Sequence, residues 1–423
     1  MKRAVAVIDG EHYAPVVRAA LADLPYEFVG AYLVGGTEKL RGGEEYGVPV
    51  AMGLEEALDG LQPELVVDLS DEPVLGPRQR LRLASRVLAR GLPYVGPDFR
   101  FDPPELESFA PPSIAVIGTG KRTGKTAVTG HVARLLAREH NLIVVAMGRG
   151  GPPEPDVAEV PPTVEQLLEL ARAGRHAASD YLETAALARV VTVGCRRCGG
   201  GLAGATAISN VSEGAALAAS RSPDLVLFDG SGAAVPPVAT DKRVLVASAL
   251  QEPELVAGYL NEYRVLLADL VVLTMAEDRT RYQEVRRAIA GLKDVTVVAV
   301  VLRPRPMKSV AGRRVAFFGT APPEAHARIA EWLEAEHGAE VVHVSGNLAR
   351  RGELRRELER IEADVYLVEI KAAAIDVVAE AATQRGAATV FADNDILPLP
   401  GEPNLDTALT QLAEAARSEA VAR

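Results

Sequence analysis

The chain has 423 residues, a formal net charge of −11, two cysteines and an aromatic content of 4%. This length predicts about two or three domains, and the acidic balance argues against nucleic acid or an anionic membrane as the main partner. No apolar run approaches the roughly 18 residues of a membrane span. Because so few cysteines do not make a disulfide scaffold, we expect a cytoplasmic protein.

The N-terminal part of the chain alternates strand and helix patterns. Arg3–Ile8, Phe28–Val34 and Leu65–Leu69 are predicted strands, and Arg80–Arg90 is a predicted amphipathic helix. This alternation predicts a parallel α/β domain, whose ligands lie beyond the carboxyl ends of the strands. Five polar residues follow the first and third strands and form a predicted acidic rim: Asp9, Glu11, His12, Asp68 and Asp71. For each of them, a capping or solvated role is as well supported as a functional one.

A proline-rich stretch at 97–112 ends this domain, and Ser113–Ala127 then reads SIAVIGTGKRTGKTA. A β-branched strand, a glycine-rich basic loop and a helical pattern in this order predict a phosphate-binding loop. Lys125 would reach the β- and γ-phosphates of ATP, and the Thr126 hydroxyl would ligate Mg²⁺. The loop departs from the usual spacing, because Thr119 stands where a glycine is expected. The residues expected to contact the nucleotide are Gly118, Gly120, Lys121, Arg122, Thr123, Gly124, Lys125, Thr126 and Ala127.

Two later glycine-rich segments carry arginines. The predicted strand Leu142–Ala146 runs into MGRGGPPEP, where Arg149 is placed to reach a phosphate, although a surface role is equally open. The segment Gly194–Gly201, GCRRCGGG, predicts a loop on which two adjacent arginines bind an anion closely. The expected substrate-binding residues are therefore Arg149, Arg196, Arg197, Gly199 and Gly200.

The cysteines of this segment, Cys195 and Cys198, form a CxxC pattern. Such a pattern suggests a redox or zinc site. However, two thiols alone do not complete a tetrahedral zinc site, and glycines follow where a redox motif would open a helix. The anion-binding interpretation of the neighbouring arginines is therefore the favoured one.

Asp229 is the second expected magnesium ligand. It follows the apolar run Asp224–Phe228 and precedes Gly-Ser-Gly, which is typical of the second Mg²⁺-organising element of such ATPases. A proline-marked exit at 303–306 then precedes a third α/β unit. The sequence thus predicts an α/β fold with a P-loop NTPase core and parallel sheet, flanked by N-terminal and C-terminal Rossmann-like domains. The expected boundaries are 1–110, 111–310 and 311–423.

These motifs together resemble the cyclic 2,3-diphosphoglycerate synthetase family over most of the chain. The resemblance is carried by IDGEHY at 8–13, the loop at 118–126, MGRGGPPEP at 147–155, GCRRCGGG at 194–201 and DGSG at 229–232. It implies ATP-dependent closure of 2,3-bisphosphoglycerate into a cyclic pyrophosphate, with release of ADP and phosphate.

Such a reaction needs positioning and charge neutralisation rather than covalent catalysis. The residues expected to take part in catalysis are Lys121, Lys125, Arg196, Arg197 and Asp229. A different P-loop kinase, or an ATP-dependent ligase acting on a small phosphorylated or carboxylated metabolite, is the main alternative. A non-enzymatic nucleotide switch is disfavoured, because a switch does not need a second anion pocket. Since symmetric dimers are the commonest assemblies, we expect a homodimer.

Overall fold

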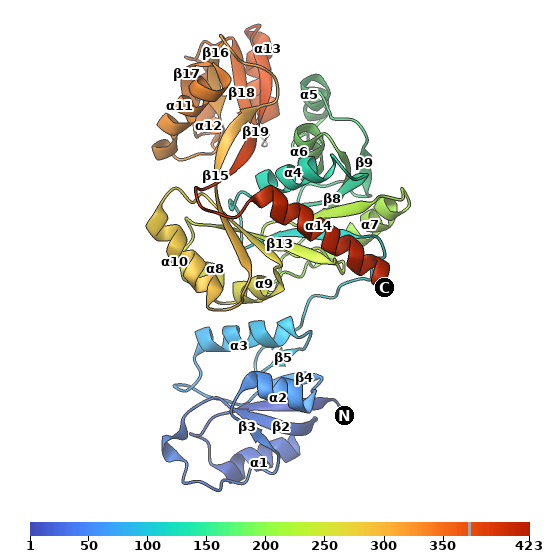
Figure 1. Cartoon of the computed structure of the whole chain (residues 1–423), viewed down its shortest axis with the longest axis vertical. Helices are drawn as coiled ribbons and strands as arrows, with labels where there is room; N and C mark the ends of the chain where they lie inside the picture. Colours follow the sequence, from blue (N-terminus) through green and yellow to red (C-terminus); the bar gives the residue numbers. More distant parts are fainter. Residues whose placement is uncertain (371–373) are drawn as a thin grey trace.

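The computed structural model describes residues 1–370 and 374–423 of the chain. Three α/β units follow one another along the long axis of the molecule, with the N-terminal unit at the bottom of Figure 1 and the C-terminal unit at the top. Within the described residues, no helix has the length and apolar character that crossing a membrane requires. The α/β class and the parallel P-loop sheet predicted from the sequence are confirmed.

The N-terminal unit is built on a six-stranded sheet in the order β3-β2-β1-β4-β5-β6. Its central strand is apolar and buried from Ala4 to Ile8, because helices cover a parallel sheet of this kind. The strands are β1 (Arg3–Ile8), β2 (Glu27–Leu33), β3 (Val50–Ala51), β4 (Leu65–Asp68), β5 (Tyr94–Val95) and β6 (Arg100–Phe101). The helices are α1 (Ala14–Asp23), α2 (Leu54–Leu61) and α3 (Pro77–Ala89), with a 3-10 turn at Thr37–Lys39.

The central unit contains the predicted phosphate-binding loop. Its strands are β7 (Ser113–Gly118), β8 (Leu142–Gly148), β9 (Asp156–Ala158), β10 (Val191–Cys198), β11 (Ile208–Ser209), β12 (Leu225–Asp229), β13 (Lys242–Ser248) and β14 (Leu270–Thr274). Its helices are α4 (Lys125–Leu136), α5 (Val164–Arg172), α6 (Asp180–Ala188), α7 (Val211–Ala219), α8 (Pro253–Ala257), α9 (Asn261–Leu267) and α10 (Arg279–Ala290).

Strand β7 lies between β12 and β13, so the loop after it is at the middle of the sheet. All six of its residues are buried. Ile114 and Val116 pack against α4, whereas Ala115 and Ile117 belong to the core on the opposite face. A strand buried on both faces explains why the sequence there is continuously apolar rather than alternating.

The C-terminal unit continues the same sheet. Its strands are β15 (Thr296–Pro306), β16 (Arg314–Phe318), β17 (Glu340–Ser345), β18 (Val365–Glu369) and β19 (Ala388–Pro398). Its helices are α11 (His326–His337), α12 (Arg351–Leu358), α13 (Glu380–Gln384) and α14 (Leu405–Ala422), with a 3-10 turn at Pro323–Ala325 and a π-helical segment at Ala374–Ala379. The complete thirteen-stranded sheet runs β11-β10-β8-β12-β7-β13-β14-β15-β19-β18-β16-β17, and β9 pairs with β10.

The proline-marked segment at 303–306 is not a loop, because it lies within β15, which runs on to Pro306; its place as the end of the central domain remains a prediction. Strand β15 pairs parallel with β14 up to Ala299 and antiparallel with β19 from Val300 to Pro306. The prolines alternate with arginines, so their missing N–H groups fall on one edge of the strand, away from β19. On that edge the Pro304 carbonyl accepts a hydrogen bond of 3.1 Å from Trp332 Nε1 of α11.

Helix α14 returns to the central unit. Its buried residues Leu405, Leu409, Ala413 and Ala416 belong to the same core as α4 and the strand β7. In Figure 1 it crosses the central sheet, far from the remainder of the C-terminal unit. The domain boundaries remain a prediction, but this helix packs outside the unit to which the sequence assigns it.

The N-terminal unit meets the central unit through α3 and α9 (Figure 1). The Glu262 carboxylate on α9 is fully buried and accepts from Arg82 Nε at 2.9 Å and Arg86 Nε at 3.0 Å, both on α3. Ser85 Oγ also donates to the Tyr259 carbonyl at 2.8 Å. Polar and charged contacts therefore fix this interface alongside an apolar cluster that includes Leu260 and Tyr263.

Candidate functional site

The loop between β7 and α4 is held by backbone and side-chain contacts from neighbouring strands. Thr119 N donates to the Val246 carbonyl at 3.1 Å, and Thr274 Oγ1 donates to the Thr123 carbonyl at 2.6 Å. Gly124 has a φ of 79°, and an added Cβ would lie 2.9 Å from Leu302 Cδ1. The loop therefore needs glycine here both for its backbone conformation and for space.

The Thr123 hydroxyl is buried and has no hydrogen-bond partner among the described residues. A buried polar group without a partner is costly, so one inside a glycine-rich loop is consistent with a ligand-binding role for the loop. Thr126 and Ala127 lie partly exposed in the first turn of α4, where the helix N-terminus favours anions. Lys121 and Arg122 are exposed on the loop, and Arg122 has a φ of 60°.

Lys125 and Asp229 meet directly. Lys125 Nζ forms an ion pair with Asp229 Oδ1, and Thr129 Oγ1 donates to the same oxygen at 2.8 Å. The side chains of Lys125 and Asp229 are 10% and 2% exposed, so the pair is nearly excluded from water. Asp229 is the last residue of β12, which lies next to β7 in the sheet; its position at the end of an apolar strand is as predicted, and its role as a magnesium ligand remains a prediction.

A second group of cations gathers at Gly232. A Cβ added to Gly232 would lie 3.3 Å from Arg149 Nη2, 3.8 Å from Arg197 Nη2 and 4.0 Å from Lys121 Cγ. Gly232 is also close to the phosphate-binding loop, because a Cβ on Gly118 would lie 2.9 Å from its carbonyl oxygen. The structure therefore brings together basic residues from three separate segments, beside the loop predicted to hold the nucleotide.

Arg197 is fixed in place by oxygen acceptors. Its Nη2 donates to Ser231 O at 2.9 Å and Ser231 Oγ at 3.1 Å, and its Nη1 donates to the Gly199 carbonyl at 2.6 Å. Burial and the neighbouring charge of Arg149 lower the pKa of Arg197, while Asp180 acts in the opposite direction. The two guanidinium groups thus repel each other, a repulsion that an anion placed between them would relieve.

Arg196 lines a cavity of about 400 Å³ beside this group. The lining residues are Arg149, Gly151, Arg196, Arg197, Cys198 and Ile208. Arg196 is exposed, and its backbone N–H donates to Asn210 Oδ1 at 2.6 Å. The predicted substrate-binding arginines therefore share one cavity, with the adjacent Gly199 at a φ of 74° and Gly200 next to the Arg197 side chain.

The prediction that these arginines sit on a loop is wrong. Arg196 and Arg197 lie in the last part of strand β10, before Cys198, where Arg196 pairs with Gly148 of β8 and Arg197 pairs with Ser209 of β11. The short antiparallel partner β11 keeps the chain extended beyond the apolar part of β10. Adjacent residues of a strand point to opposite faces, which explains why Arg196 is more exposed than Arg197.

The cysteines occupy different environments. Cys195 is 1% exposed within the central core, and its burial raises the pKa of the thiol to about 12. Cys198 is exposed, and both thiols are free. Because residues three apart on a strand face opposite sides, β10 separates the two thiols.

Several residues of this site were not predicted. Thr129 donates a hydrogen bond to the Asp229 carboxylate. Ser231 accepts from Arg197, and Asn210 accepts from the backbone of Arg196. The charge of Asp180 opposes the lowering of the Arg197 pKa. Only Ser231 had a signal in the sequence, since it belongs to the Asp-Gly-Ser-Gly segment. The others come from helices or loops whose neighbours in space are far apart along the chain.

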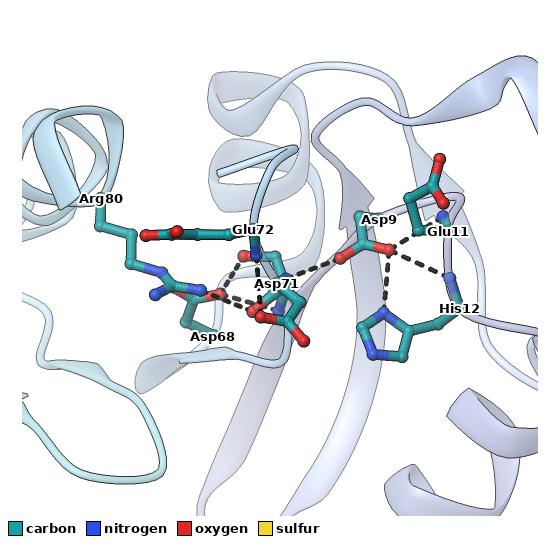
Figure 2. A network of polar contacts seen from close by, with 8 residues as sticks. Asp9, Glu11, His12, Asp68, Asp71, Glu72 and Arg80 are labelled. Carbon is teal, nitrogen blue, oxygen red and sulfur yellow. Dashed lines mark hydrogen bonds and ion pairs between the residues drawn. The ribbon is translucent and has the colours of Figure 1, made fainter. Parts of the chain in front are cut away.

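The predicted acidic rim of the N-terminal unit is a hydrogen-bonded network (Figure 2). Asp9, fully buried, accepts from Glu11 N at 2.9 Å, His12 N at 3.1 Å and His12 Nδ1 at 2.8 Å through Oδ1, and from Asp71 N at 2.7 Å through Oδ2. Burial raises the pKa of Asp9, but the hydrogen bonds from His12 and Asp71 outweigh it and hold the pKa below its ordinary value.

Asp68 anchors the other half of this network. Its carboxylate accepts hydrogen bonds from Arg80 Nε at 3.0 Å and from Tyr94 OH at 2.7 Å, and it also accepts one from the backbone N–H of Ser70. Asp9 and Asp68 thus tie down the loops after β1 and β4, and Figure 2 shows the two halves meeting at Asp71. These contacts give both carboxylates a structural role, so a ligand-binding role for the rim remains a prediction.

Family comparisons fit this geometry. Three models describe parts of cyclic 2,3-diphosphoglycerate synthetase: the N-terminal domain matches residues 3–102, the P-loop domain 113–303 and the C-terminal domain 306–395. This chain belongs to the cyclic 2,3-diphosphoglycerate synthetase family. The P-loop domain of the family contains every residue predicted for the nucleotide and substrate sites.

Relatives with the name cyclic 2,3-diphosphoglycerate synthetase are similar over almost the whole chain. The protein of Rubrobacter xylanophilus is 51% identical over 98% of each chain. That of Methanothermus fervidus is 39% identical over 98% of this chain and 97% of its own, and that of Pyrococcus abyssi is 42% identical over 97% and 98%. Among solved structures, LpxK of Aquifex aeolicus in complex with ATP covers 79% of this chain and 95% of its own, with 14% identity and a TM-score of 0.44.

Proposed function

We propose that this protein uses ATP to close 2,3-bisphosphoglycerate into cyclic 2,3-diphosphoglycerate, with release of ADP and phosphate. Family membership supports the reaction. The observation that carries the site is the approach of Arg149, Arg197 and Lys121 to Gly232, beside the phosphate-binding loop. Like charges gathered beside one another favour a multiply anionic ligand, and a bisphosphate offers several negative charges at once.

For the nucleotide, we propose that Lys125 exchanges its partner. In the ligand-free protein it pairs with Asp229, and bound ATP would offer it the β- and γ-phosphates instead. The backbone of residues 118–124 and the N-terminus of α4 would then surround the phosphates. Release of Lys125 leaves Asp229 hydrogen-bonded to Thr129 and available to a cation.

The residues proposed to hold Mg²⁺ are Thr126 and Asp229. They offer a hydroxyl and a carboxylate oxygen, which suit a hard cation that keeps several waters and binds phosphate oxygens. Both bonds that Asp229 accepts go to Oδ1, so Oδ2 is the oxygen proposed for the cation. When bound, Mg²⁺ would neutralise charge on the phosphates.

The proposed chemistry has two steps. First, a phosphate oxygen of bisphosphoglycerate attacks the γ-phosphorus of ATP, which breaks the bond to ADP and forms a phosphoanhydride on the substrate. Second, the neighbouring substrate phosphate attacks the phosphorus atom attached directly to the glycerate, and inorganic phosphate leaves as the ring closes. In both steps Lys121, Lys125 and the arginines orient the phosphates and offset their charge.

Phosphorus NMR tests this function. With Mg-ATP and 2,3-bisphosphoglycerate, we expect the two monoester signals to become coupled anhydride signals while ADP and phosphate appear in equal amounts. ATP consumption with a linear phosphorylated product would instead make the protein a kinase. No ATP consumption with bisphosphoglycerate would contradict the proposal. The expected homodimer is tested separately, by the mass of the protein in solution.

A further inference from the structure

Helix α9 lies where the predicted nucleotide and substrate segments meet. Asn261 Nδ2 donates to the carbonyl of Thr119 in the phosphate-binding loop at 3.1 Å. Arg264 donates to the carbonyls of Ala233, which follows Gly232, and Leu202, which follows the glycines after Arg197. We propose that Arg264 is a positioning residue for the substrate segments and that Asn261 positions the nucleotide loop. This inference rests on the proposed function.

Arg264 is unusual for a buried arginine. Its side chain is 2% exposed, and its five hydrogen bonds all go to uncharged oxygens. Nε and Nη2 reach Ala233 O at 2.8 and 2.6 Å, Nη2 reaches Leu202 O at 3.1 Å, and Nη1 reaches Leu260 O and Asn261 Oδ1 at 3.0 Å each. Within the part of the chain that the structure describes, no carboxylate pairs with this cation, so its five hydrogen bonds to Ala233, Leu202, Leu260 and Asn261 are what offset the cost of its burial.

The planar guanidinium of Arg264 connects two segments of the proposed substrate site. It joins these two segments, namely 199–204 and 229–233, because Nη2 donates to the carbonyls of both Leu202 and Ala233 while Nε donates again to Ala233 and Nη1 holds the group to α9. The rigid planar arrangement of five donors fixes all these directions together. The same segments meet directly, because Val235 N donates to Gly204 O at 2.9 Å. A Cβ on Gly204 would lie 3.3 Å from Arg264 Nη2, so the guanidinium packs tightly against this junction.

The charge of Arg264 persists at neutral pH. Burial lowers its pKa to about 10, which is still well above neutrality. The fixed positive charge therefore lies directly behind Ala233, one residue from the point where Arg149 and Arg197 converge. It would add to the field at an anion without touching it, as expected of a positioning residue.

The test compares two neighbouring substitutions on α9. Arg264→Lys keeps the charge but has three donors in place of five and no planar fork, so it cannot reproduce the five hydrogen bonds that fix the two segments to α9. We expect it to raise the KM for bisphosphoglycerate or lower kcat by about 10- to 100-fold, with little change in the KM for ATP. Asn261→Ala removes the hydrogen bond to the Thr119 carbonyl and should have the opposite effect: the KM for ATP should rise more than the KM for bisphosphoglycerate. Since Asn261 is partly exposed, this variant also keeps the inference testable if Arg264→Lys does not fold.

Arg286→Lys is the matched control. Arg286 is a partly buried arginine on α10 that donates to Glu402 and to the Val297 carbonyl, away from both predicted sites. The Arg286→Lys variant should have a lower melting temperature, but its KM for ATP and its KM for bisphosphoglycerate should not change relative to each other. Equal effects of Arg264→Lys on both substrates, or the same kinetic pattern in Arg286→Lys, would overturn the inference.

Hydrogen exchange separates this inference from the proposed reaction. In the ligand-free protein, we expect the amides of residues 199–204 and 230–235 to exchange faster in Arg264→Lys than in the wild type, and not in Arg286→Lys. Pyrophosphate should also bind Arg264→Lys more weakly than the wild type. If the wild type made no cyclic product, the proposed function would fail, but these two comparisons would still decide the role of Arg264. Unchanged exchange and unchanged pyrophosphate binding would refute it.

Discussion

At the scale of single residues, the nucleotide and substrate predictions depend on few side chains with well-defined partners. Lys125 faces the buried carboxylate of Asp229, and Arg196 faces the cavity that the other arginines line. Because each of these side chains has a different proposed ligand, single substitutions should affect ATP and bisphosphoglycerate differently.

Lys125→Ala should lower kcat by about 100- to 1000-fold, since a cation that stabilises charge on the transferred phosphoryl group is lost. ADP release in the presence of both substrates measures this effect. Lys242→Ala is a suitable control, because Lys242 pairs with Glu419 of α14 rather than with the loop. An active Lys125→Ala enzyme would refute the assigned nucleotide site.

Arg196→Ala should raise the KM for bisphosphoglycerate by about 10- to 100-fold, the value of one charge-assisted hydrogen bond, and should change the KM for ATP less. Steady-state kinetics with each substrate varied in turn measures the split. Arg221→Ala provides the control, because Arg221 pairs with the exposed Glu159. Equal changes for both substrates would remove Arg196 from the substrate site.

At the scale of secondary-structure elements, the loop after β8 packs directly on strand β10. A Cβ on Gly151 would lie 2.0 Å from the Cys195 carbonyl oxygen, so Gly151→Ala must displace the strand that carries Arg196. We expect a loss of about 1–3 kcal/mol in stability, together with weaker bisphosphoglycerate binding. Denaturant unfolding and substrate titration measure the two effects.

Gly60 provides the comparison for this substitution. It lies in α2, and a Cβ there would meet no atom within 4 Å. Gly60→Ala should therefore be neutral or stabilise the protein by about 0.5–1 kcal/mol, because alanine restricts the unfolded chain. If the two substitutions had the same effect, the close approach at Gly151 would not matter.

The hydrogen bonds of Asp9, which hold the loops after β1 and β4, should make the stability of the protein depend on pH. The pKa of Asp9 is below its ordinary value of 3.8, so its stabilising contribution is complete above that pH and disappears as the pH falls through the folded-state pKa. Asp9→Asn, which places an amide against backbone donors, should destabilise the protein at neutral pH, and the difference should shrink in acid.

Urea unfolding at several pH values, down to about pH 3, measures this difference. Asp23→Asn is the control, because Asp23 is exposed at the end of α1. A stability difference between wild type and Asp9→Asn that does not change with pH would contradict the proposed role of the carboxylate.

Local patterns predicted the elements around the site better than the contacts between them. The strand β1, the loop at 118–124 and Asp229 at the end of β12 all follow from apolar runs and the residues that end them. The extension of β10 through Arg197 and of β15 through Pro306 depends on partner strands β11 and β19, which are remote or very short. Arg264 gives no signal in the sequence, because its partners lie on segments that only the fold brings together.

At the scale of the whole molecule, one buried carboxylate contributes strongly to the contact between the N-terminal unit and the central unit. Replacing both Arg82 and Arg86 by alanine would leave Glu262 buried without a cation, which should cost about 3–5 kcal/mol. We expect faster proteolysis of the connecting segment 103–112 and earlier unfolding in denaturant.

Arg90→Ala is the control for this interface. Arg90 lies at the end of the same helix but pairs with Glu55 and Asp59 inside the N-terminal unit, where all three side chains are exposed. It should change neither the proteolysis nor the unfolding appreciably. Equal behaviour of the two variants would show that Glu262 does not hold the units together.

The strands shared by the central and C-terminal units determine how stiff the molecule is. A domain on a flexible linker can pivot as a rigid body, but β15 and β19 are paired from Val300 to Pro306, and Ala392 to Pro398 run alongside. A large rotation would break this ladder of hydrogen bonds, whereas a slight change of sheet twist would not. The C-terminal unit can therefore follow the central sheet only by small elastic bending. Larger movements near the site belong to the loops around the cavity, since the N-terminal unit is held by the α3–α9 interface.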